Sequence, residues 1–315
     1  MDWLTECPSC ASAKILRWGK RYFAKRDKPQ DLRDAENQIL LGRLERKSLV
    51  RQIYLCLSCS FLFQNPTYDA HELQQIYGEA GPRSVDYYES VGKSAKDLWA
   101  SPIARKHSNE RQSTYADAIL ASGASQILDY GGGSGINLQH SLLNHTKRYV
   151  YDFGKDSVSE KKIISIKSLE TEKCFDFILH THVLEHERDP ISSLKKLRQL
   201  IAPKGTLYLE VPFDYTERII SRRPGAIWHV NHFNRKTIVE VGMRAGWWCK
   251  EIRVTRLPYS HLFLNCIVAL MKPDWDGSQH KRPVKIINVG FDMLWALLKR
   301  AQHSSVLSQL FRVLI

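Results

Sequence analysis

Four glycines stand within five positions, Gly131, Gly132, Gly133 and Gly135, shortly after an apolar segment that ends in a carboxylate, Asp129. Glycine tolerates positive φ and, because it has no side chain, lets another molecule approach the main chain closely. A strand, a sharp glycine turn and a helix start together form a general cradle for a small molecule. These residues therefore predict a ligand-binding turn.

The spacing of the glycines narrows the choice of ligand. A dinucleotide site needs Gly-x-Gly-x-x-Gly, and when this pattern starts at Gly131 its last glycine falls at Ile136. The two later starting points fail as well. No Gly-Lys-Ser/Thr closes the turn in the manner of a nucleoside triphosphate loop. Both kinds of phosphate-binding turn are therefore disfavoured.

Four of the seven cysteines form two Cys-x-x-Cys pairs, Cys7 with Cys10 and Cys56 with Cys59, and 45 residues separate the pairs. Each pair places two thiolates on one tight turn, and two such turns make a tetrahedral four-sulfur site that suits zinc. Cysteines without a metal are the alternative. Residues 31–49 between the pairs have a helical pattern, which predicts a helix inserted into this module.

Cysteine usage and the first residues of the chain also bear on location. An odd number of cysteines with metal-like spacing fits a reducing compartment better than a disulfide scaffold. The start has no basic segment followed by an apolar one, and no stretch approaches the ~18 apolar residues of a membrane span. We therefore expect a cytoplasmic protein without a transmembrane segment.

Ionisable side chains gather after two apolar segments. His182, Glu185 and His186 follow the segment that begins at Phe175, and His229 and His232 follow residues 205–212. Histidine, with a pKa near ~6.5, suits the removal of a proton from a hydroxyl group or from a carbon beside a carbonyl. We predict His182 as the base because it lies nearest to the end of its strand. Glu185, His186 and His232 are further catalytic candidates.

The run His182-Val-Leu-Glu185-His186 also matches the inverted zinc-peptidase signature. Such a site needs both histidines one turn apart within a helix, together with a third ligand downstream. Here the run begins at the end of a predicted strand. This context disfavours a peptidase.

Strand-like and helix-like segments alternate through the middle of the chain. Strands are predicted at 125–131, 148–154, 161–168, 175–182, 205–212 and within 261–272, and helices at 70–78, 102–122, 191–201 and 234–247. Such alternation predicts an α/β fold with a mostly parallel sheet and helices on both faces.

The chain divides into four predicted parts. Residues 1–66 form a zinc-ribbon module with a basic helical insertion, 67–104 a helical linker or lid, and 105–272 the α/β domain. Residues 273–315 read as a basic amphipathic helical segment. This last part can dock on the main domain, pair with another subunit or make peripheral contact with a membrane.

The pattern Asp129-x-Gly131-x-Gly133-x-Gly135 resembles the ligand-binding turn of class I S-adenosylmethionine-dependent methyltransferases. Asp152, the segment 175–190 and the segment 197–212 fall at the intervals of that family. The resemblance covers roughly residues 105–270. It implies a Rossmann-like, mostly parallel seven-stranded sheet and S-adenosyl-L-methionine as the cofactor.

The same resemblance assigns roles to residues of the turn. Asp152 would accept hydrogen bonds from both ribose hydroxyls, and Asp129 would help to hold the amino group of the ligand. Asp129 as a cap of the turn and Asp152 as a surface acid are the alternatives. The other implied cofactor-binding residues are Tyr130, Gly131, Gly133, Gly135, Phe153, His180 and Thr181.

The cysteine module in front of this domain is similar to that of sugar C-methyltransferases, although the 45-residue separation departs from their compact ribbon. This similarity implies a small polar acceptor, a sugar or a sugar nucleotide. Some quinone O-methyltransferases bind a divalent cation through Glu-x-x-Glu-His. His182 replaces the first acid of that motif here, which leaves metal binding at this loop open.

Charge leaves two other functions open. The net charge is +13, and residues 14–51 carry 12 basic and 5 acidic side chains. A basic module permits nucleic acid as a partner, so an RNA methyltransferase is one alternative. A solvated helical face explains the same charges. A binding protein that has kept this fold without turnover is a further alternative, and the oligomeric state stays open.

Overall fold

The computed structural model describes residues 3–25, 32–77, 101–153, 160–166, 168–169, 174–221, 228–259 and 262–275. Most of the predicted C-terminal helical segment, from residue 276 onward, lies outside these residues. Residues 78–100 of the predicted linker also lie outside them.

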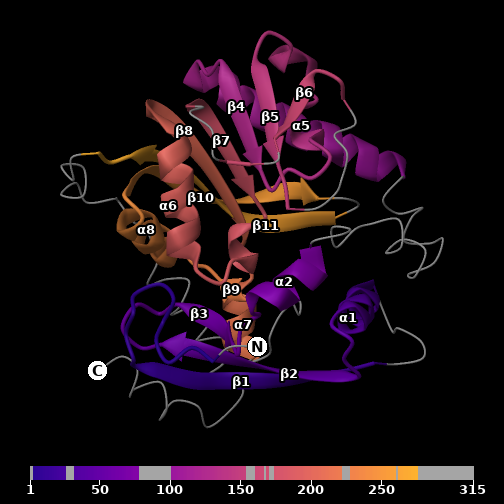
Figure 1. Ribbon diagram of the computed structural model, residues 1–315, viewed down its shortest axis with the longest axis vertical. Coiled ribbons are helices and arrows are strands. Elements are labelled where there is room, and N and C mark those ends of the chain that lie inside the picture. Colours follow the sequence, from indigo (N-terminus) through magenta and orange to yellow (C-terminus); the bar gives the residue numbers. More distant parts are fainter. Residues whose placement is uncertain are drawn as a thin grey trace.

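A seven-stranded sheet forms the larger part of the fold, in the strand order β10-β11-β8-β7-β4-β5-β6 (Figure 1). The five strands from β4 to β8 run parallel to their neighbours, whereas β11 is antiparallel to β8 and β10 is antiparallel to β11. The prediction of a mostly parallel α/β sheet is confirmed. The strands are β4 (Gln126–Tyr130), β5 (Lys147–Tyr151), β6 (Ile163–Ile166), β7 (Phe175–Thr181), β8 (Ile201–Pro212), β10 (Trp247–Tyr259) and β11 (Leu262–Pro273).

One of these strands, β10, has no counterpart among the predicted strands. It lies at the edge of the sheet, and its middle residues are mostly exposed or half-buried. A register shift between Cys249 and Glu251 further disturbs its alternation. A strand covered on only part of its surface lacks the apolar pattern that marks a buried strand.

Helices cover both faces of the sheet, as predicted (Figure 1). Residues of α6 (Pro190–Leu200) and α8 (Arg235–Arg244) pack with Leu128 of β4, whereas residues of α5 (Pro102–Ser122) pack with Ile127. Neighbouring positions of a strand point to opposite faces. The two sets of helices therefore lie on opposite sides.

Capping residues set the ends of these helices. Ser101 accepts a hydrogen bond from the Ala104 amide at the start of α5, and Gly123, with φ of 70°, ends it. The observed bounds equal the predicted range 102–122. Asp189 caps α6 in the same way, and Asn234 forms a capping box with Thr237 at the start of α8.

A second sheet of four strands, in the order β1-β2-β3-β9, lies below the first in Figure 1. Its last strand, β9, comes from much later in the chain than the other three, and it pairs with β3 through Leu62 opposite His232 and Phe63 opposite Asn231. The two parts of the molecule therefore share a sheet. Its strands are β1 (Ile15–Ala24), β2 (Ser48–Cys56), β3 (Leu62–Asn65) and β9 (Asn231–His232).

The insertion between the two cysteine pairs contains α1 (Leu32–Arg43), as predicted, but also the antiparallel strands β1 and β2 on either side of it. The helix α2 (Ala70–Tyr77) follows, and its predicted cap is confirmed because Asp69 Oδ1 accepts the Glu72 amide at 2.9 Å. The short helix α7 (Tyr215–Ser221) packs against this module, where Tyr215 and Ile219 contact Trp18 and Ile53.

The helix expected after the glycine turn is replaced by two 3₁₀ turns, η1 (Ile136–Leu138) and η2 (Ser141–Leu143). His140 lies between the two turns. Its Nδ1 accepts the Leu142 amide at 3.3 Å and so caps the start of η2. Among the described helices, none combines the length and the apolar character needed to cross a bilayer.

Candidate functional site

The parallel strands place the predicted site residues at one edge of the large sheet. The chain runs from β4 outward to β5 and β6 and then returns to β7 on the other side of β4. Ligands of open α/β sheets bind beyond the carboxyl ends of the strands at such a reversal. The glycine turn follows β4, Asp152 follows β5 and His182 follows β7, so all three lie there.

The glycine turn has room only for main chain. Gly131, Gly133 and Gly135 have φ of 77°, 52° and 77°. A Cβ atom added at Gly131 would overlap Val183 Cγ2, and one added at Gly132 would overlap the carboxyl group of Asp129. Side chains are excluded both by backbone conformation and by space. The predicted sharp glycine turn is therefore present.

The two carboxylates beside the turn differ in environment. Asp152 Oδ2 accepts the Gly133 amide at 2.8 Å. Asp129 is fully buried, and its Oδ2 accepts a hydrogen bond from Asn137 Nδ2 at 3.0 Å. No described residue donates to its other oxygen, Oδ1. Burial raises the pKa of Asp129 to about 7, against the opposing hydrogen bond from Asn137.

The remaining predicted cofactor residues divide into two groups. Phe153 is exposed and stands edge-on to Tyr130, with ring centres 6.3 Å apart. His180 is fully buried behind Tyr130, at 5.2 Å between ring centres, and burial lowers its pKa to about 4. Thr181, the last residue of β7, is buried as well. Phe153 lines the open side, whereas His180 lies in the core below the site.

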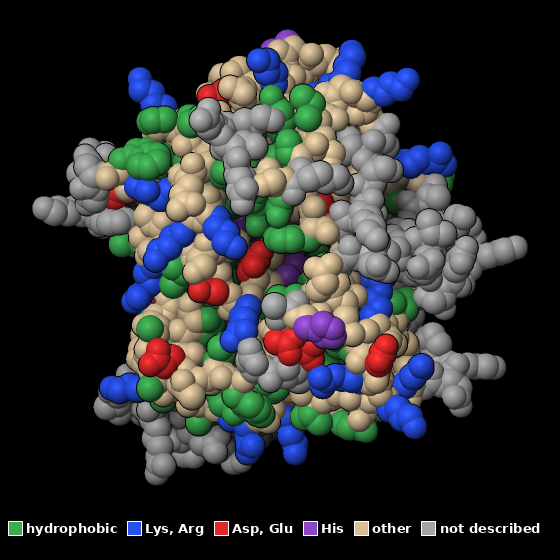
Figure 2. All heavy atoms as spheres, viewed as in Figure 1, with side chains coloured by type: hydrophobic (Ala, Val, Ile, Leu, Met, Phe, Trp, Pro, Cys, Tyr) green, Lys and Arg blue, Asp and Glu red, His purple; other side chains and the backbone are tan. Residues whose placement is uncertain are grey.

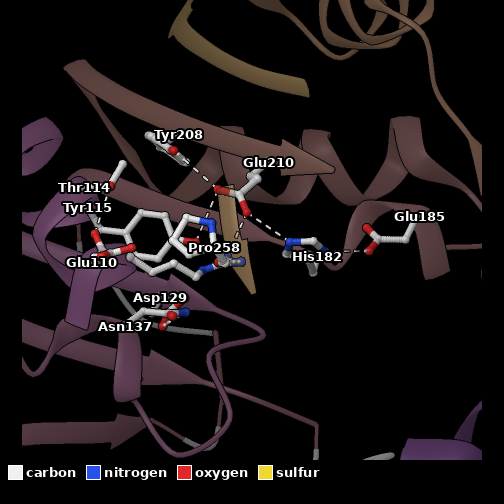
Figure 3. Close-up of polar contacts among 11 residues, drawn as sticks. Glu110, Thr114, Tyr115, Asp129, Asn137, His182, Glu185, Tyr208, Glu210 and Pro258 are labelled. Carbon is white, nitrogen blue, oxygen red and sulfur yellow. Dashed lines mark hydrogen bonds and ion pairs between the residues drawn. The ribbon is translucent and has the colours of Figure 1, made fainter. Parts of the chain in front are cut away.

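His182 lies between two carboxylates (Figure 3). Its Nε2 is 3.0 Å from Glu210 Oε1, and its Nδ1 is 3.5 Å from Glu185 Oε1. Because carboxylate oxygens only accept, protons on both ring nitrogens satisfy this geometry best. Burial alone would lower the pKa of His182, but its contacts with Cys266, Glu185 and Glu210 raise it well above the ordinary value. The geometry therefore indicates an imidazolium.

Glu210, at the end of β8, is the centre of this network (Figure 3). Its side chain is completely buried and pairs with Arg111 Nη2 at 2.8 Å. Tyr115 and Tyr208 donate to its other oxygen at 3.3 and 3.4 Å. Burial opposes ionisation of Glu210, but the positive charge of Arg111 and the contact with His182 lower its pKa.

A second group gathers beside His182. Glu185, His186 and His229 bring one ligand atom each within 4.8 Å of one another. His186 Nε2 is 3.5 Å from Glu185 Oε1, and its Nδ1 donates to the Trp228 carbonyl oxygen at 3.1 Å. Burial lowers the pKa of His229 to about 3, so this ring is neutral. The three residues offer a mixed acid and imidazole cluster at the edge of the sheet.

The peptidase geometry is absent from the described residues around this run. Leu184–His186 form a single 3₁₀ turn, η3, and His182 precedes it with φ of 55°. The two histidines are therefore not one turn apart on a helix. This geometry does not fit a peptidase site.

His232 has a different hydrogen-bond partner from the other catalytic candidates. It belongs to β9, is fully buried, and its Nδ1 lies 3.0 Å from both carboxylate oxygens of Asp214. Asp214 lies between β8 and α7, and the hydrogen bonds of the His232 ring do not connect it with Glu185 or His186. His182, Glu185 and His186 are the predicted candidates that the fold brings together.

The four predicted metal ligands form one cluster. Cys7 Sγ lies 3.6 Å from Cys59 Sγ, and Cys10 Sγ lies 3.5 Å from Cys56 Sγ. The two turns are alike: the residue after each second cysteine, Ala11 or Ser60, has a positive φ and donates its amide to the carbonyl of the first cysteine. The hydrogen bond with Cys7 lowers the pKa of Cys59 to about 5.

The fold also brings residues to the site that no local sequence pattern predicts. Asn137 binds Asp129, Glu210 contacts His182, and Arg111 pairs with Glu210, but none of the three belongs to a recognised motif. Glu210 carries a signal that could have been used, because it is a charged residue within the apolar strand Leu207–Val211. A buried acid in such a strand requires a partner.

Residues 104–234 match the model of a family described as a methyltransferase domain. The match covers less than half of the chain. None of the curated proteins matches the sequence.

Several solved structures are similar. The 1,6-didemethyltoxoflavin-N1-methyltransferase of Burkholderia thailandensis, with bound 1,6-didemethyltoxoflavin and S-adenosylhomocysteine, is 16% identical, with 71% of this chain and 95% of that chain covered and a TM-score of 0.46. Magnesium protoporphyrin IX methyltransferase from Synechocystis PCC 6803 is 16% identical, with 59% and 96% covered and a TM-score of 0.41. The N-methyltransferase NodS of Bradyrhizobium japonicum WM9 is 17% identical, with 57% and 97% covered and a TM-score of 0.41.

Proposed function

We propose that the protein transfers a methyl group from S-adenosylmethionine to a small polar acceptor, a sugar or a sugar nucleotide. The observation that carries the proposal is the bare glycine turn between Asp129 and Asp152, where added side-chain atoms would overlap Val183 or Asp129 itself. A phosphate-free nucleoside with a charged amino acid part needs this combination of open main chain and two carboxylates.

The residues of the turn fit this cofactor. Asp129 Oδ1 is buried and receives no hydrogen bond from the described residues, so it is available to an ammonium group. Asp152 stands at the end of the neighbouring strand, where a carboxylate can accept both hydroxyls of a ribose. Phe153, exposed beside Tyr130, offers an apolar surface to a base.

When bound, the sulfonium supplies a methyl group that is already activated for displacement. The chain has to align the acceptor, exclude water and take up a proton. His182 is a donor held between Glu210 and Glu185, so we assign proton uptake to the pair Glu185 and His186 instead. In this assignment His182 orients Glu185.

Polar side chains at the sheet edge support a polar acceptor. Glu185, His186 and His229 lie together there. Figure 2 shows acidic and histidine side chains at the floor of a hollow near the middle of the visible face. An acceptor with several hydroxyl groups matches such a surface, because each can donate to a carboxylate or an imidazole.

We also propose that the four cysteines hold a structural zinc ion. Zinc–sulfur bonds of about 2.3 Å at tetrahedral angles place the sulfur atoms about 3.8 Å apart. The observed separations of 3.6 and 3.5 Å are close to that value. The Ser9 amide donates to Cys7 Sγ at 3.4 Å, which stabilises a thiolate.

Calorimetric titration of the zinc-loaded protein with S-adenosylmethionine tests the cofactor. Asp152→Ala is expected to weaken binding about 10- to 100-fold, because it removes charge-assisted hydrogen bonds worth ~1.5–3 kcal/mol. Asp117→Ala, on the exposed side of α5, is the control and should bind within about twofold of the wild type. No binding by the wild type, or equal binding by Asp152→Ala, would contradict the proposal.

The acceptor class is tested separately. Sugar nucleotides are incubated with the protein and S-adenosylmethionine, and products are examined by mass spectrometry for one added methyl group. Methylation of RNA but of no sugar nucleotide would replace the proposed acceptor class.

A further inference from the structure

The second sheet holds the loop that carries His229. The Gln64 amide in β3 donates to the Val230 carbonyl oxygen at 2.7 Å, and Gln64 Nε2 donates to the His229 carbonyl oxygen. On its other side the Val230 amide donates to the Glu185 carbonyl oxygen at 2.9 Å. The loop is thus fixed between the N-terminal module and the turn that carries Glu185 and His186.

The side chain of Asn231 in β9 strengthens the contact between this loop and the turn that carries Glu185 and His186. Asn231 Nδ2 donates to the carbonyl oxygens of Leu184 and Glu187, at 3.3 and 2.6 Å. His186 Nδ1 donates to the Trp228 carbonyl oxygen, and the His186 and His229 rings meet at 4.8 Å between centres. The position of the η3 turn therefore depends on the position of residues 228–231.

Gln64 is anchored from the side of the cysteine cluster. Its side chain is 1% exposed, and β3 begins shortly after Cys59. The Cys56 amide donates to the Phe61 carbonyl oxygen at 2.8 Å, and the Phe61 ring packs on Phe233 at 5.1 Å. Both contacts fix the strand in register beside β9.

We propose that Gln64 is a positioning residue for the cluster Glu185, His186 and His229, so that the N-terminal module completes the acceptor side of the methyltransferase site. Its side-chain amide is the donor that fixes the His229 carbonyl, and its main chain fixes the next residue. That this cluster binds the methyl acceptor rests on the proposed function. That Gln64 positions the cluster does not depend on the proposed function.

The test compares Gln64→Met with Gln52→Met in the full-length, zinc-loaded protein. Methionine has a similar length but cannot donate a hydrogen bond. Gln52 lies on β2, one strand further from β9, and is the matched control. Histidine ¹³Cε1 spectra are recorded, with the His186 and His229 signals assigned from His186→Gln and His229→Gln, and amide exchange is measured for Val230 and Asn231.

Gln64→Met is expected to shift the His186 and His229 signals and to speed exchange at Val230 and Asn231 about tenfold, while the signal of the exposed His145 stays in place. Gln52→Met should leave all of these as in the wild type. Unchanged signals and exchange in Gln64→Met, or equal changes in Gln52→Met, would overturn the proposal.

Binding of S-adenosylmethionine, measured on the same samples, separates the two levels of inference. Both variants should bind within about twofold of the wild type, because Gln64 is remote from the glycine turn in the hydrogen-bond network. If no sample binds, the proposed function fails, and the spectra still decide the role of Gln64. A large loss of binding in Gln64→Met alone would contradict a role confined to the acceptor side.

Discussion

Glu210 holds His182 in two ways. Its main-chain carbonyl accepts the His182 amide at 2.9 Å, and its carboxylate Oε1 lies 3.0 Å from His182 Nε2. His182 has φ of 55°, a conformation that costs a non-glycine residue about 1 kcal/mol. Such strain concentrates at functional sites, where surrounding contacts impose it. Here it turns the imidazole between Glu210 and Glu185.

Replacing Glu210 with Gln removes the buried partner of Arg111 and one of the two carboxylates beside His182. Removal of one member of a buried ion pair costs ~3 kcal/mol, so the free energy of unfolding should fall by about that amount in urea. The pKa of His182 should fall as well, because a negative charge that stabilises its protonated form is gone. Histidine ¹³Cε1 spectra recorded against pH measure the second effect.

Glu110→Gln is the control for this variant. Glu110 pairs with Lys106 at 3.8 Å on the exposed surface of the same helix as Arg111. Exposed pairs contribute less than about 0.5 kcal/mol. Equal losses of stability in the two variants would show that the network around Glu210 is not the stabilising feature described here.

Asp129 should make stability depend on pH. Its folded-state pKa of about 7 lies above the ordinary value of 3.8, so the native state keeps a proton that the unfolded chain releases. The stabilisation that the protonated Asp129 carboxyl gives to the native state is complete below pH 3.8 and is lost as the pH rises through about 7. Relative to Asp129→Asn, the wild type should lose about 3 kcal/mol of unfolding free energy between pH 5 and pH 8.

Urea unfolding of both proteins at several pH values measures this difference, because other titrating groups cancel. Asp117→Asn, which changes an exposed carboxylate on α5, should follow the wild type. Parallel curves for the wild type and Asp129→Asn would contradict the raised pKa.

Gly131 and Gly123 allow backbone strain to be separated from steric overlap. Their φ values are 77° and 70°, but an added Cβ atom meets Val183 only at Gly131 and meets nothing within 4 Å at Gly123. Gly123→Ala should therefore cost about 1 kcal/mol of unfolding free energy, from strain alone. Gly131→Ala should cost 1–3 kcal/mol more because of overlap, ~2–4 in total.

A double variant checks the cause of that extra loss. Val183→Ala removes the methyl group that an alanine at position 131 would overlap. The combination of Gly131→Ala with Val183→Ala should recover most of the excess, as measured by thermal unfolding. No recovery would mean that the turn excludes side chains for another reason.

Local signals were sufficient for much of the fold. The helical pattern of residues 102–122 predicts α5 with its observed bounds, and residue type and spacing alone identify the glycine turn and the cysteine pairs. The edge strand β10 was missed because partial exposure removes the apolar alternation that defines a strand.

Long-range pairing accounts for the rest. The sequence placed His182 at the end of its strand, but nothing near it in the chain shows that Glu210 and Glu185 would occupy both ring nitrogens. The pairing of β3 with β9 is equally non-local. A contact between distant segments is decided by the packing of whole elements and leaves no periodic pattern in either segment.

The number of cysteine thiols that react with a reagent should depend on whether zinc is bound. Of the cysteines, Cys174 is exposed, Cys249 and Cys266 are buried, and the other four form the cluster. A zinc-loaded chain should therefore show one fast-reacting thiol toward a chromogenic disulfide reagent. After zinc is displaced by a mercurial and the mercurial is removed under reducing conditions, five thiols should react, and a metallochromic dye should report about one zinc ion per chain.

Cys174→Ser should abolish the fast reaction without altering the zinc content. Several fast thiols in the untreated protein, or displacement without release of zinc, would show that the four cysteines are not metal ligands.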